Sequence, residues 1–227
     1  MAQSVLIIAD SGTGKSTSMR NLDPKETFII NIANKPLPFK GWKKNYTNIS
    51  KDNPKGNMTS ASSAAGIVKA IQHVNDKMPN VKNLIIDDWQ YMSSFEYFDR
   101  ANEKGYDKFT QIASNLAQVA KFPKDLREDL HVFFLTHSED STDINGHRKV
   151  KAKTIGKMID NALTLEGLFS IVLFGRVIKE EDGNLKYVFE TQNNGENTCK
   201  SPMGMFDDNH IPNDLQHVRD CILEYEK

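Results

Sequence analysis

Short apolar runs separated by polar or amphipathic stretches set the hydrophobic pattern of this chain. Four runs have the length of buried β-strands: residues 5–8, 27–32, 83–87 and 131–136. Apolar residues recur at helical spacing in five other stretches: residues 64–74, 91–98, 109–119, 155–163 and 213–225. Strands that alternate with helices predict an α/β fold, with a mostly parallel sheet flanked by helices and a short terminal helix.

Polar segments interrupt this pattern. Residues 34–60 are rich in Pro, Gly, Asn and Lys, which predicts an excursion with little regular structure. Residues 138–153 are polar and predict a mobile loop. The stretches 169–177 and 185–191 flank an acidic turn that contains glycine, which predicts a C-terminal β-hairpin. Because no linker divides the sequence, we expect a single domain over residues 1–227.

The strongest chemical signal directly follows the first strand. The run Ala9-Asp10-Ser11-Gly12-Thr13-Gly14-Lys15-Ser16 has the spacing of a P-loop, and residues 15–21 are expected to open a helix. Glycines let successive N–H groups face phosphate oxygens, Lys15 would reach the β- and γ-phosphates, and the Ser16 hydroxyl would hold Mg²⁺. The usual first Gly is Ala9 here, where a methyl group should be tolerated. The residues expected to bind ATP are Ser11, Gly12, Thr13, Gly14, Lys15, Ser16 and Thr17.

Acidic and polar residues end the third and fourth predicted strands, at residues 83–87 and 131–136. Leu84-Ile85-Ile86-Asp87-Asp88 looks like a Walker B element, in which Asp87 reaches the carboxyl edge of the sheet and holds Mg²⁺. Asp88 is the candidate for polarising the attacking water, and its alternative role is to cap the helix that starts near Trp89. Thr136 and His137 end the fourth strand and are candidates for sensing the γ-phosphate; a purely local structural role of His137 is the alternative.

Two basic stretches are candidates for nucleic-acid contacts. The first comprises Arg148, Lys149, Lys151, Lys153 and Lys157. Its cations could hold a phosphate backbone, and the alternative is a solvated loop. The second stretch, residues 35–46, interleaves four lysines with Phe39, Trp42 and Tyr46. This composition suits stacking on single-stranded bases, and the alternative is a lid whose aromatic rings pack on the core.

Composition narrows the function only slightly. The formal net charge of −1 provides no global attraction to nucleic acid. The two cysteines, Cys199 and Cys221, lack the spacing of a metal site and are not expected to form a disulfide. No apolar run approaches the length of a membrane span, and the N-terminal residues carry no export signal. We therefore expect a cytoplasmic protein without a membrane partner.

Several phrases of the sequence resemble one known family. Beside the P-loop and the Walker B element, they are residues 35–42 (KPLPFKGW), 105–109 (GYDKF), 153–158 (KTIGKM) and 190–195 (ETQNNG). Together they resemble the phage-encoded AAA-family ATPases found with recombination genes, a compact RecA-like group associated with single-strand annealing. The resemblance extends from the P-loop to about Phe206.

The resemblance implies a RecA-like P-loop NTPase core that uses ATP and Mg²⁺, with DNA-dependent ATP hydrolysis. It implies binding of single-stranded DNA in support of recombination or replication, in the cytoplasm of the bacterial host. It also implies a homo-oligomer with ATP at subunit interfaces, and a phage annealing or single-strand-binding protein as a further partner. Residues 100–108 and 138–155 would correspond to DNA-facing loops, and Lys200 to a cation supplied across an interface.

The catalytic assignment takes one departure from the family pattern into account. RecA-type recombinases place a catalytic Glu after the strand that follows the P-loop helix, where this chain has Asn31 and Asn34. Water activation is therefore assigned to Asp88. The full set of catalytic candidates is Lys15, Asp88, His137 and Lys200.

Three other functions stay open at this stage. A helicase loader of the AAA+ type needs a C-terminal helical lid with a sensor arginine, and few residues follow the strand at 185–191. A small-molecule kinase needs an arginine-rich lid, whereas residues 138–153 hold one Arg and mostly Lys. A nucleotide-switched binding protein without turnover is the third alternative. ATP turnover measured with and without single-stranded DNA separates these functions.

Overall fold

The computed structural model describes residues 2–142, 146, 148–155 and 163–227. Its strands are β1 (Ser4–Ala9), β2 (Thr27–Asn31), β3 (Met58–Thr59), β4 (Asn83–Asp87), β5 (His131–Thr142), β6 (Arg148–Ala152), β7 (Ile171–Lys179), β8 (Leu185–Glu190) and β9 (His210–Pro212). Its α-helices are α1 (Trp42–Asn45), α2 (Ala64–Lys77), α3 (Gln90–Asp99), α4 (Asp107–Lys121) and α6 (Leu215–Tyr225). Its 3-10 helices are η1 (Ser16–Asn21), η2 (Phe122–Asp125) and η3 (Leu165–Leu168).

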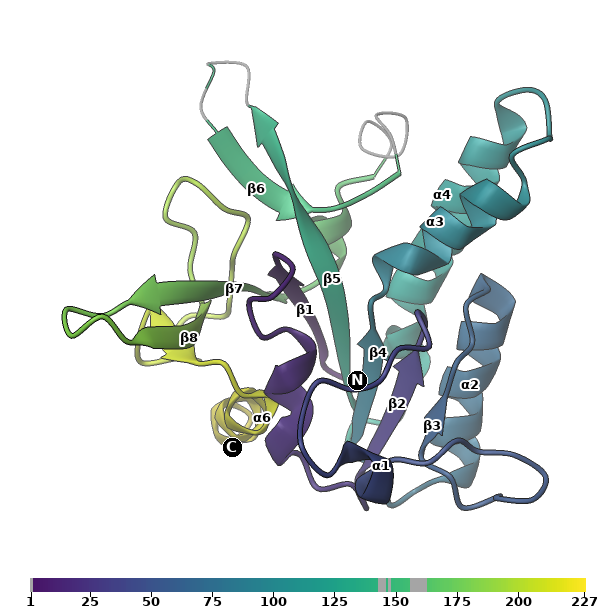
Figure 1. Ribbon diagram of the computed structural model, residues 1–227, viewed down its shortest axis with the longest axis horizontal. Coiled ribbons are helices and arrows are strands. Elements are labelled where there is room, and N and C mark those ends of the chain that lie inside the picture. The colour runs from purple at the N-terminus through teal and green to yellow at the C-terminus, as the bar shows by residue number, and fades with distance from the viewer. Residues whose placement is uncertain (1, 143–145, 147, 156–162) are drawn as a thin grey trace.

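One sheet organises the molecule, with the strand order β3-β2-β4-β5-β1-β7-β8-β9 and with β6 paired to β5 outside this path (Figure 1). Strands β3, β2, β4, β5, β1 and β7 run parallel, and β8 and β9 continue the sheet antiparallel. Helices α2, α3 and α4 pack on one face, and η1 and α6 pack on the other. The predicted α/β fold with a mostly parallel sheet, a C-terminal hairpin and a terminal helix is confirmed.

The strand order brings the candidate residues to one edge of the sheet. Strand β5 lies between β1 and β4, and all three strands are parallel. Their carboxyl ends therefore lie side by side, which places Ala9, Asp87 and Thr136 along the same edge. In open α/β sheets ligands bind at this edge. Among the helices that the structure describes, none has both the length and the apolar content that crossing a membrane requires.

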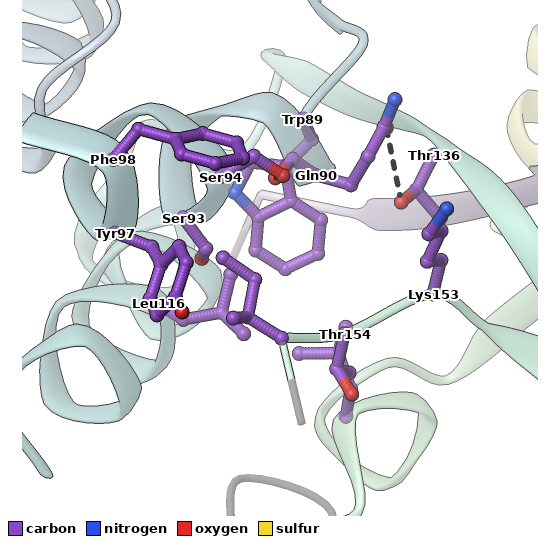
Figure 2. A pocket seen from close by; sticks show the side chains of 12 residues that line it. Trp89, Gln90, Ser93, Ser94, Tyr97, Phe98, Leu116, Thr136, Lys153 and Thr154 are labelled. Carbon is purple, nitrogen blue, oxygen red and sulfur yellow. Dashed lines mark hydrogen bonds between the residues drawn. The ribbon is translucent and has the colours of Figure 1, made fainter. Parts of the chain in front are cut away.

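Where the structure describes residues 138–153, most of them form two strands, so the expectation of a loop is wrong, and their mobility stays a prediction. The second half of β5 leaves the sheet and pairs antiparallel with β6 as a two-stranded ribbon. Ion pairs Arg148–Asp140 and Lys151–Glu139 join its strands. Because the ribbon carries few apolar residues, the hydrophobic pattern gives no strand signal there. The base of the ribbon and helix α3 border a cavity (Figure 2).

Two expected helices also differ from their predictions. Residues 15–21 were expected to open an α-helix, but η1 is a 3-10 helix of 6 residues. The Ser18 hydroxyl donates to the carbonyl oxygen of Lys15 at 2.5 Å, and such local bonds compete with regular helix formation. Leu22 then turns the chain into extended backbone. The helix expected over residues 155–163 lies largely outside the described residues.

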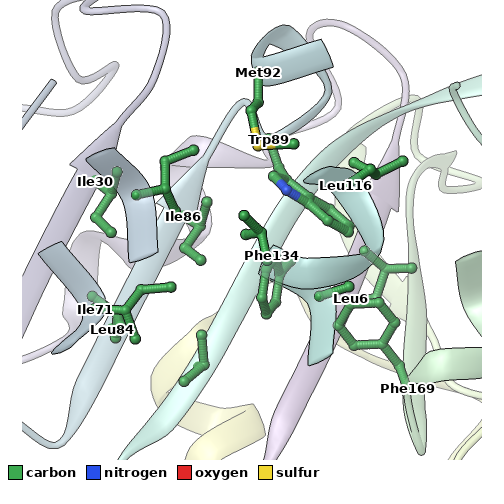
Figure 3. Packing of buried hydrophobic residues seen from close by; sticks show 14 of the residues in the cluster. Leu6, Ile30, Ile71, Leu84, Ile86, Trp89, Met92, Leu116, Phe134 and Phe169 are labelled. Atoms are coloured by element: carbon green, nitrogen blue, oxygen red, sulfur yellow. The ribbon is translucent and has the colours of Figure 1, made fainter. Parts of the chain in front are cut away.

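Alternate residues of the central strands face opposite sides of the sheet, so both faces are apolar. Figure 3 shows the face beneath α2, α3 and α4, where the Trp89 ring packs against two phenylalanine rings. Its ring centroid lies 4.7 Å from that of Phe134 and 6.0 Å from that of Phe169. The buried Trp89 directly follows the Walker B carboxylates, and it therefore anchors the turn that carries Asp88.

The departure at Ala9 has a structural counterpart on the neighbouring strand. Ala9 pairs with Gly175 of β7, and a Cβ atom on Gly175 would lie 2.8 Å from the Cβ atom of Ala9. One methyl group fits between the strands at this level, and two do not. The pair Ala9 and Gly175 therefore preserves the close packing of the P-loop strand against β7.

We expect Gly175→Ala to destabilise the fold by about 1–3 kcal/mol, as overpacked core positions do. Ala9→Gly in the same protein should recover most of this loss, because it removes the opposing methyl group. Urea unfolding of the single and double variants measures both effects. Gly167→Ala is the matched control, since a Cβ there meets its nearest neighbour at 3.7 Å. Equal losses from Gly175→Ala with and without Ala9→Gly would contradict the pairing.

Candidate active site

The P-loop curls around the side chain of its own lysine. Gly12 and Gly14 have φ angles of 81° and 88°, in the left-handed region that glycine adopts without strain. The ammonium group of Lys15 donates to the carbonyl oxygens of Ala9 at 3.2 Å and Asp10 at 3.4 Å. Burial lowers the pKa of Lys15, against the opposing effect of the nearby carboxylates Asp88 and Asp87. The loop thus holds a buried cation whose partners are neutral oxygens that an anion can replace.

A cavity of about 550 Å³ opens above this loop. The lining residues come from the P-loop and η1, from the segment after β2, from the ends of β4 and β5, and from the β8–β9 region: Ser11, Gly12, Gly14, Lys15, Ser16, Thr17, Arg20, Lys35, Pro38, Asp88, Tyr91, His137, Tyr187, Pro212 and Asn213. Its size falls within the range of ligand pockets, roughly 300–1,000 Å³.

Ser16 and Asp87 meet beneath this cavity. The Ser16 hydroxyl donates to Asp87 Oδ1 at 2.8 Å. Burial raises the pKa of Asp87 to about 6, with a further contribution from the charge of Asp88. A hydroxyl and a carboxylate in contact beside a phosphate cradle are the oxygen ligands that Mg²⁺ takes together with nucleotide phosphates. The donor set therefore fits a magnesium ion carried by a nucleotide.

Asp88 occupies an unusual backbone conformation, with a φ angle of 58°. The following residue, Trp89, is fully buried, and its N–H donates to the carbonyl oxygen of Leu135 at 2.9 Å. Helix α3 begins at Gln90, and its N-cap residue Trp89 makes no side-chain capping bond. The two Asp88 carboxylate oxygens contact Lys35 and His137 instead of helix N–H groups. The alternative that Asp88 caps this helix is therefore wrong, and the anchored turn directs its carboxylate into the cavity.

Two basic side chains flank the Asp88 carboxylate. Lys35 Nζ lies 2.5 Å from Oδ2, and His137 Nε2 lies 3.5 Å from Oδ1. Burial by itself would raise the pKa of Asp88, but the hydrogen bonds from His137 and Lys35 outweigh it and lower the pKa to about 2. Asp88 is thus ionised across the physiological pH range. A carboxylate of such low pKa suits orienting a water molecule better than removing its proton.

Lys35 belongs to this site, although sequence reasoning placed it in a basic stretch for nucleic acid. The Asn31 side chain holds the Lys35 backbone, donating to its carbonyl oxygen at 2.6 Å and accepting from its N–H at 3.3 Å. The Lys35 ammonium lies 5.6 Å from the ring centroid of Tyr91. The pKa of Lys35 is raised, because the bond to Asp88 outweighs the effect of burial. No local pattern signals this contact, since it depends on the pairing of β2 with β4.

The C-terminal strands supply the other wall, which sequence reasoning also missed. The Asn213 side chain donates to the carbonyl oxygen of Thr13 at 3.3 Å. A Cβ on Gly14 would lie 3.1 Å from Asn213 Oδ1 and 3.2 Å from a ring carbon of Tyr187. Arg20 donates to the carbonyl oxygen of Asn213 at 2.9 Å. Gly14 is therefore required both by its backbone angle and by this close packing.

Comparison with known families decides the class of this site. A family described as an AAA domain matches residues 1–203 of the chain. The chain belongs to the AAA domain family. A comparison with curated proteins finds no match. This AAA domain protein is a nucleotide-binding P-loop ATPase. The cavity above the P-loop is the candidate for its nucleotide site and is called the nucleotide cavity below.

The AAA domain gathers most, but not all, of the predicted site residues. Thr13 points away from the nucleotide cavity, and its hydroxyl donates to the carbonyl oxygen of Asp10 at 2.8 Å. Lys200 lies outside the nucleotide cavity, and its backbone pairs with Val172 of β7. Its predicted action on the nucleotide of a neighbouring subunit stays a prediction. Thr136 is buried and its hydroxyl donates to Gln90 Oε1 at 3.4 Å, so it faces away from the cavity that His137 lines.

The second basic stretch matches the lid alternative. Tyr46 is buried, with 2% of its surface exposed, and its ring centroid lies 6.2 Å from that of Phe39. Phe39 and Trp42 both pack against the apolar cluster on the η1 face of the sheet. Tyr46 is therefore part of the core, and Phe39 and Trp42 are half-buried against it.

Proposed function

We propose that this AAA domain protein has a RecA-like core, hydrolyses ATP with Mg²⁺, binds single-stranded DNA along the β5–β6 ribbon, and supports phage recombination or replication. The observation that carries the DNA assignment is the row of lysines on that ribbon. The observation that carries hydrolysis is that Lys15 and Asp88 line one cavity, with Asp87 bound to Ser16 beneath it. The two sites share His137, which ends the parallel part of β5.

In this proposal each residue of the nucleotide site has a separate task. Lys15 exchanges its carbonyl partners for phosphate oxygens and neutralises their charge. Ser16 and Asp87 would hold Mg²⁺, which supplies charge neutralisation to the bound phosphates. Asp88 accepts a hydrogen bond from the attacking water, and Lys35 and His137 keep the carboxylate ionised and oriented. Phosphoryl transfer needs little more than positioning and charge stabilisation from the protein.

Asp87→Asn should raise the Mg²⁺ concentration that gives half-maximal turnover, roughly tenfold or more, because an amide is a poorer ligand than a carboxylate. In the wild type, the Mg²⁺ concentration for half-maximal turnover should rise as the pH falls through about 6, because Asp87 takes up a proton there. The asparagine variant should lack this pH dependence. Magnesium titrations of ATPase rate between pH 5 and pH 8 test both statements. A wild-type requirement that does not change over this range would contradict the role of Asp87.

The ribbon supports the nucleic-acid part of the proposal. Lys149 and Lys151 lie two positions apart on β6, and Lys153 continues the pairing with an N–H bond to the His137 carbonyl oxygen at 2.8 Å. Alternate residues of a strand share a face, and neighbours on that face lie about 6.6 Å apart. This spacing suits successive phosphates of a single strand. Glu139 pairs with Lys151 at 3.1 Å, a partly exposed contact that DNA phosphates can replace.

Neutralising the three ribbon lysines together (Lys149→Gln, Lys151→Gln, Lys153→Gln) should weaken binding of single-stranded DNA. The slope of log affinity against log salt should fall by roughly two units if all three contact phosphates. The measurement is a salt titration of single-strand binding, with an ATP analogue and with ADP. A matched control replaces Lys40, Lys43 and Lys44, which lie at the lid. A wild-type slope in the ribbon variant in both nucleotide states would exclude the ribbon as the DNA site.

One observation favours a second candidate, a nucleotide-switched binding protein without turnover. Lys35 lies 2.5 Å from Asp88 Oδ2, so one oxygen of this carboxylate is engaged and fewer acceptor positions are left for a water molecule. Multiple-turnover phosphate release separates the two candidates.

Self-assembly, with Lys200 acting across a subunit interface, belongs to the first candidate. Mixing Lys200→Ala protein with Lys15→Ala protein should then partly restore activity, because a mixed interface can combine an intact P-loop with an intact Lys200.

A further inference from the structure

A second cavity, of about 310 Å³, lies on the other side of β5 from the nucleotide site (Figure 2). Thr136 lines this cavity and His137 lines the nucleotide cavity, because successive strand residues face opposite sides. One face of helix α3 forms its wall. That face presents Gln90, Ser93, Ser94, Tyr97 and Phe98 at helical spacing. Lys153, Thr154 and Ile155 form the opposite rim.

Three buried residues that line this cavity carry polar atoms without partners. Gln90, Ser93 and Trp89 are 7%, 3% and 0% exposed. Gln90 Nε2, Ser93 Oγ and Trp89 Nε1 have no hydrogen-bond partner among the described residues. The amide of Gln90 has a defined orientation, since the His137 N–H can only donate and Gln90 Oε1 accepts it at 3.2 Å. Buried donors are normally paired, so the unpaired atoms of Gln90 and Ser93 point to a ligand with acceptor groups.

The rim of the cavity carries the features that recognise a base and a phosphate. Phe98 is 70% exposed, and its ring contacts Tyr97 at 5.4 Å between centroids. An exposed ring of this kind is a platform on which a base stacks. Lys153 lies across the opening and is the first cation of the ribbon row that continues through Lys151 and Lys149. Figure 2 shows Phe98 and Lys153 on opposite sides of the cavity.

We propose that this cavity binds one base of a single-stranded nucleic acid, with the acceptor edge of the base toward Ser93 and Gln90, its ring against Phe98 and its phosphate at Lys153. The volume lies at the small end of ligand pockets, which suits one base. Thymine offers two carbonyl acceptors, whereas adenine offers a ring nitrogen beside an amino donor. The lysine row favours a strand over a free mononucleotide. The inference rests on the proposed binding of single-stranded DNA and names the site that holds a base.

The backbone of His137 links this cavity to the nucleotide site. Its N–H donates to Gln90 Oε1, and its carbonyl oxygen accepts from the N–H of Lys153 at 2.8 Å. Its imidazole lies 3.5 Å from the Asp88 carboxylate. A base that engages Gln90 and draws in Lys153 therefore acts on both backbone contacts of the residue that positions Asp88. Stimulation of ATP hydrolysis by DNA follows from this arrangement.

The test measures binding of labelled oligo(dT) and oligo(dA) by fluorescence anisotropy, with the full chain saturated by a non-hydrolysable ATP analogue. Phe98→Ala should weaken oligo(dT) binding about tenfold or more, the typical loss for one stacked base. Ser93→Ala should reduce the preference for oligo(dT) over oligo(dA). Tyr225→Ala is the matched control, because Tyr225 is a 48% exposed ring on α6, on the opposite face of the sheet. Circular dichroism verifies that each variant is folded.

The outcomes separate this inference from the proposed function. Wild-type binding of oligo(dT) that neither Phe98→Ala nor Ser93→Ala changes would overturn the base cavity and leave DNA binding intact. No binding of either strand by the wild type would overturn the DNA function and the cavity with it. The last measurement compares the binding of thymidine monophosphate with that of oligo(dT). Binding at least tenfold weaker than that of oligo(dT) supports a strand, and equal or tighter binding would show a site for a free nucleotide instead.

Discussion

Lys15→Ala is expected to abolish ATP hydrolysis, lowering kcat by at least about 100-fold, the loss typical for removal of one preorganised transition-state donor. Nucleotide binding should weaken as well. Lys15 is 6% exposed, and its ammonium donates to the carbonyl oxygens of Ala9 and Asp10, so its charge is available to the β- and γ-phosphates. Phosphate release and binding of a fluorescent ATP analogue measure the two effects.

The control for this variant is Lys69→Ala, which removes an exposed lysine on α2, away from the nucleotide cavity. It should leave both measurements unchanged. Loss of activity in Lys15→Ala with an intact fold assigns hydrolysis to the cavity above the P-loop. Wild-type turnover in Lys15→Ala would exclude that cavity as the catalytic site.

Asp88→Asn is expected to lower kcat about 100-fold while nucleotide affinity stays near the wild-type value. Hydrolysis needs an oriented water, whereas binding depends on the P-loop. Lys35→Ala should also lower kcat, because the lysine holds the Asp88 carboxylate at 2.5 Å. If the two act as one unit, the double variant should be close to the worse single variant. Asp129→Asn is the control, since it removes an acid whose lysine partner, Lys82, lies outside the cavity.

The pH dependence offers a separate readout for the same pair. The pKa of Asp88 is lowered to about 2, so the wild-type rate should show no acid limb from this group above about pH 4. Removing Lys35 removes one cause of that low pKa. In Lys35→Ala the loss of rate on the acid side should therefore begin at a higher pH. The stabilisation from ionised Asp88 is present above its unfolded pKa, about 3.9, and is lost as the pH falls toward 2. Additive losses in the double variant and an unchanged pH profile in Lys35→Ala would contradict the pairing.

Local sequence patterns were sufficient to predict the central strands and the core residues of the candidate nucleotide site. Strands β1, β2, β4 and the first half of β5 are buried on both faces, so each appears in the sequence as a continuous apolar run. The P-loop is contiguous, and its chemistry depends on neighbouring residues whose spacing can be counted. The contact of Ser16 with Asp87 also follows, because parallel strands end at a common edge.

Only the tertiary structure decided the contacts that depend on register and on turns. The ion pair of Lys35 with Asp88 requires β2 to pair with β4 and requires the left-handed turn that the buried Trp89 anchors. The ribbon carries few apolar residues, so its strands leave no periodic signal. The need for glycine at position 175 follows only from the methyl group of Ala9 on the adjacent strand. In each case the deciding partner is distant in sequence, and a one-dimensional pattern records the need for a partner without recording which residue supplies it.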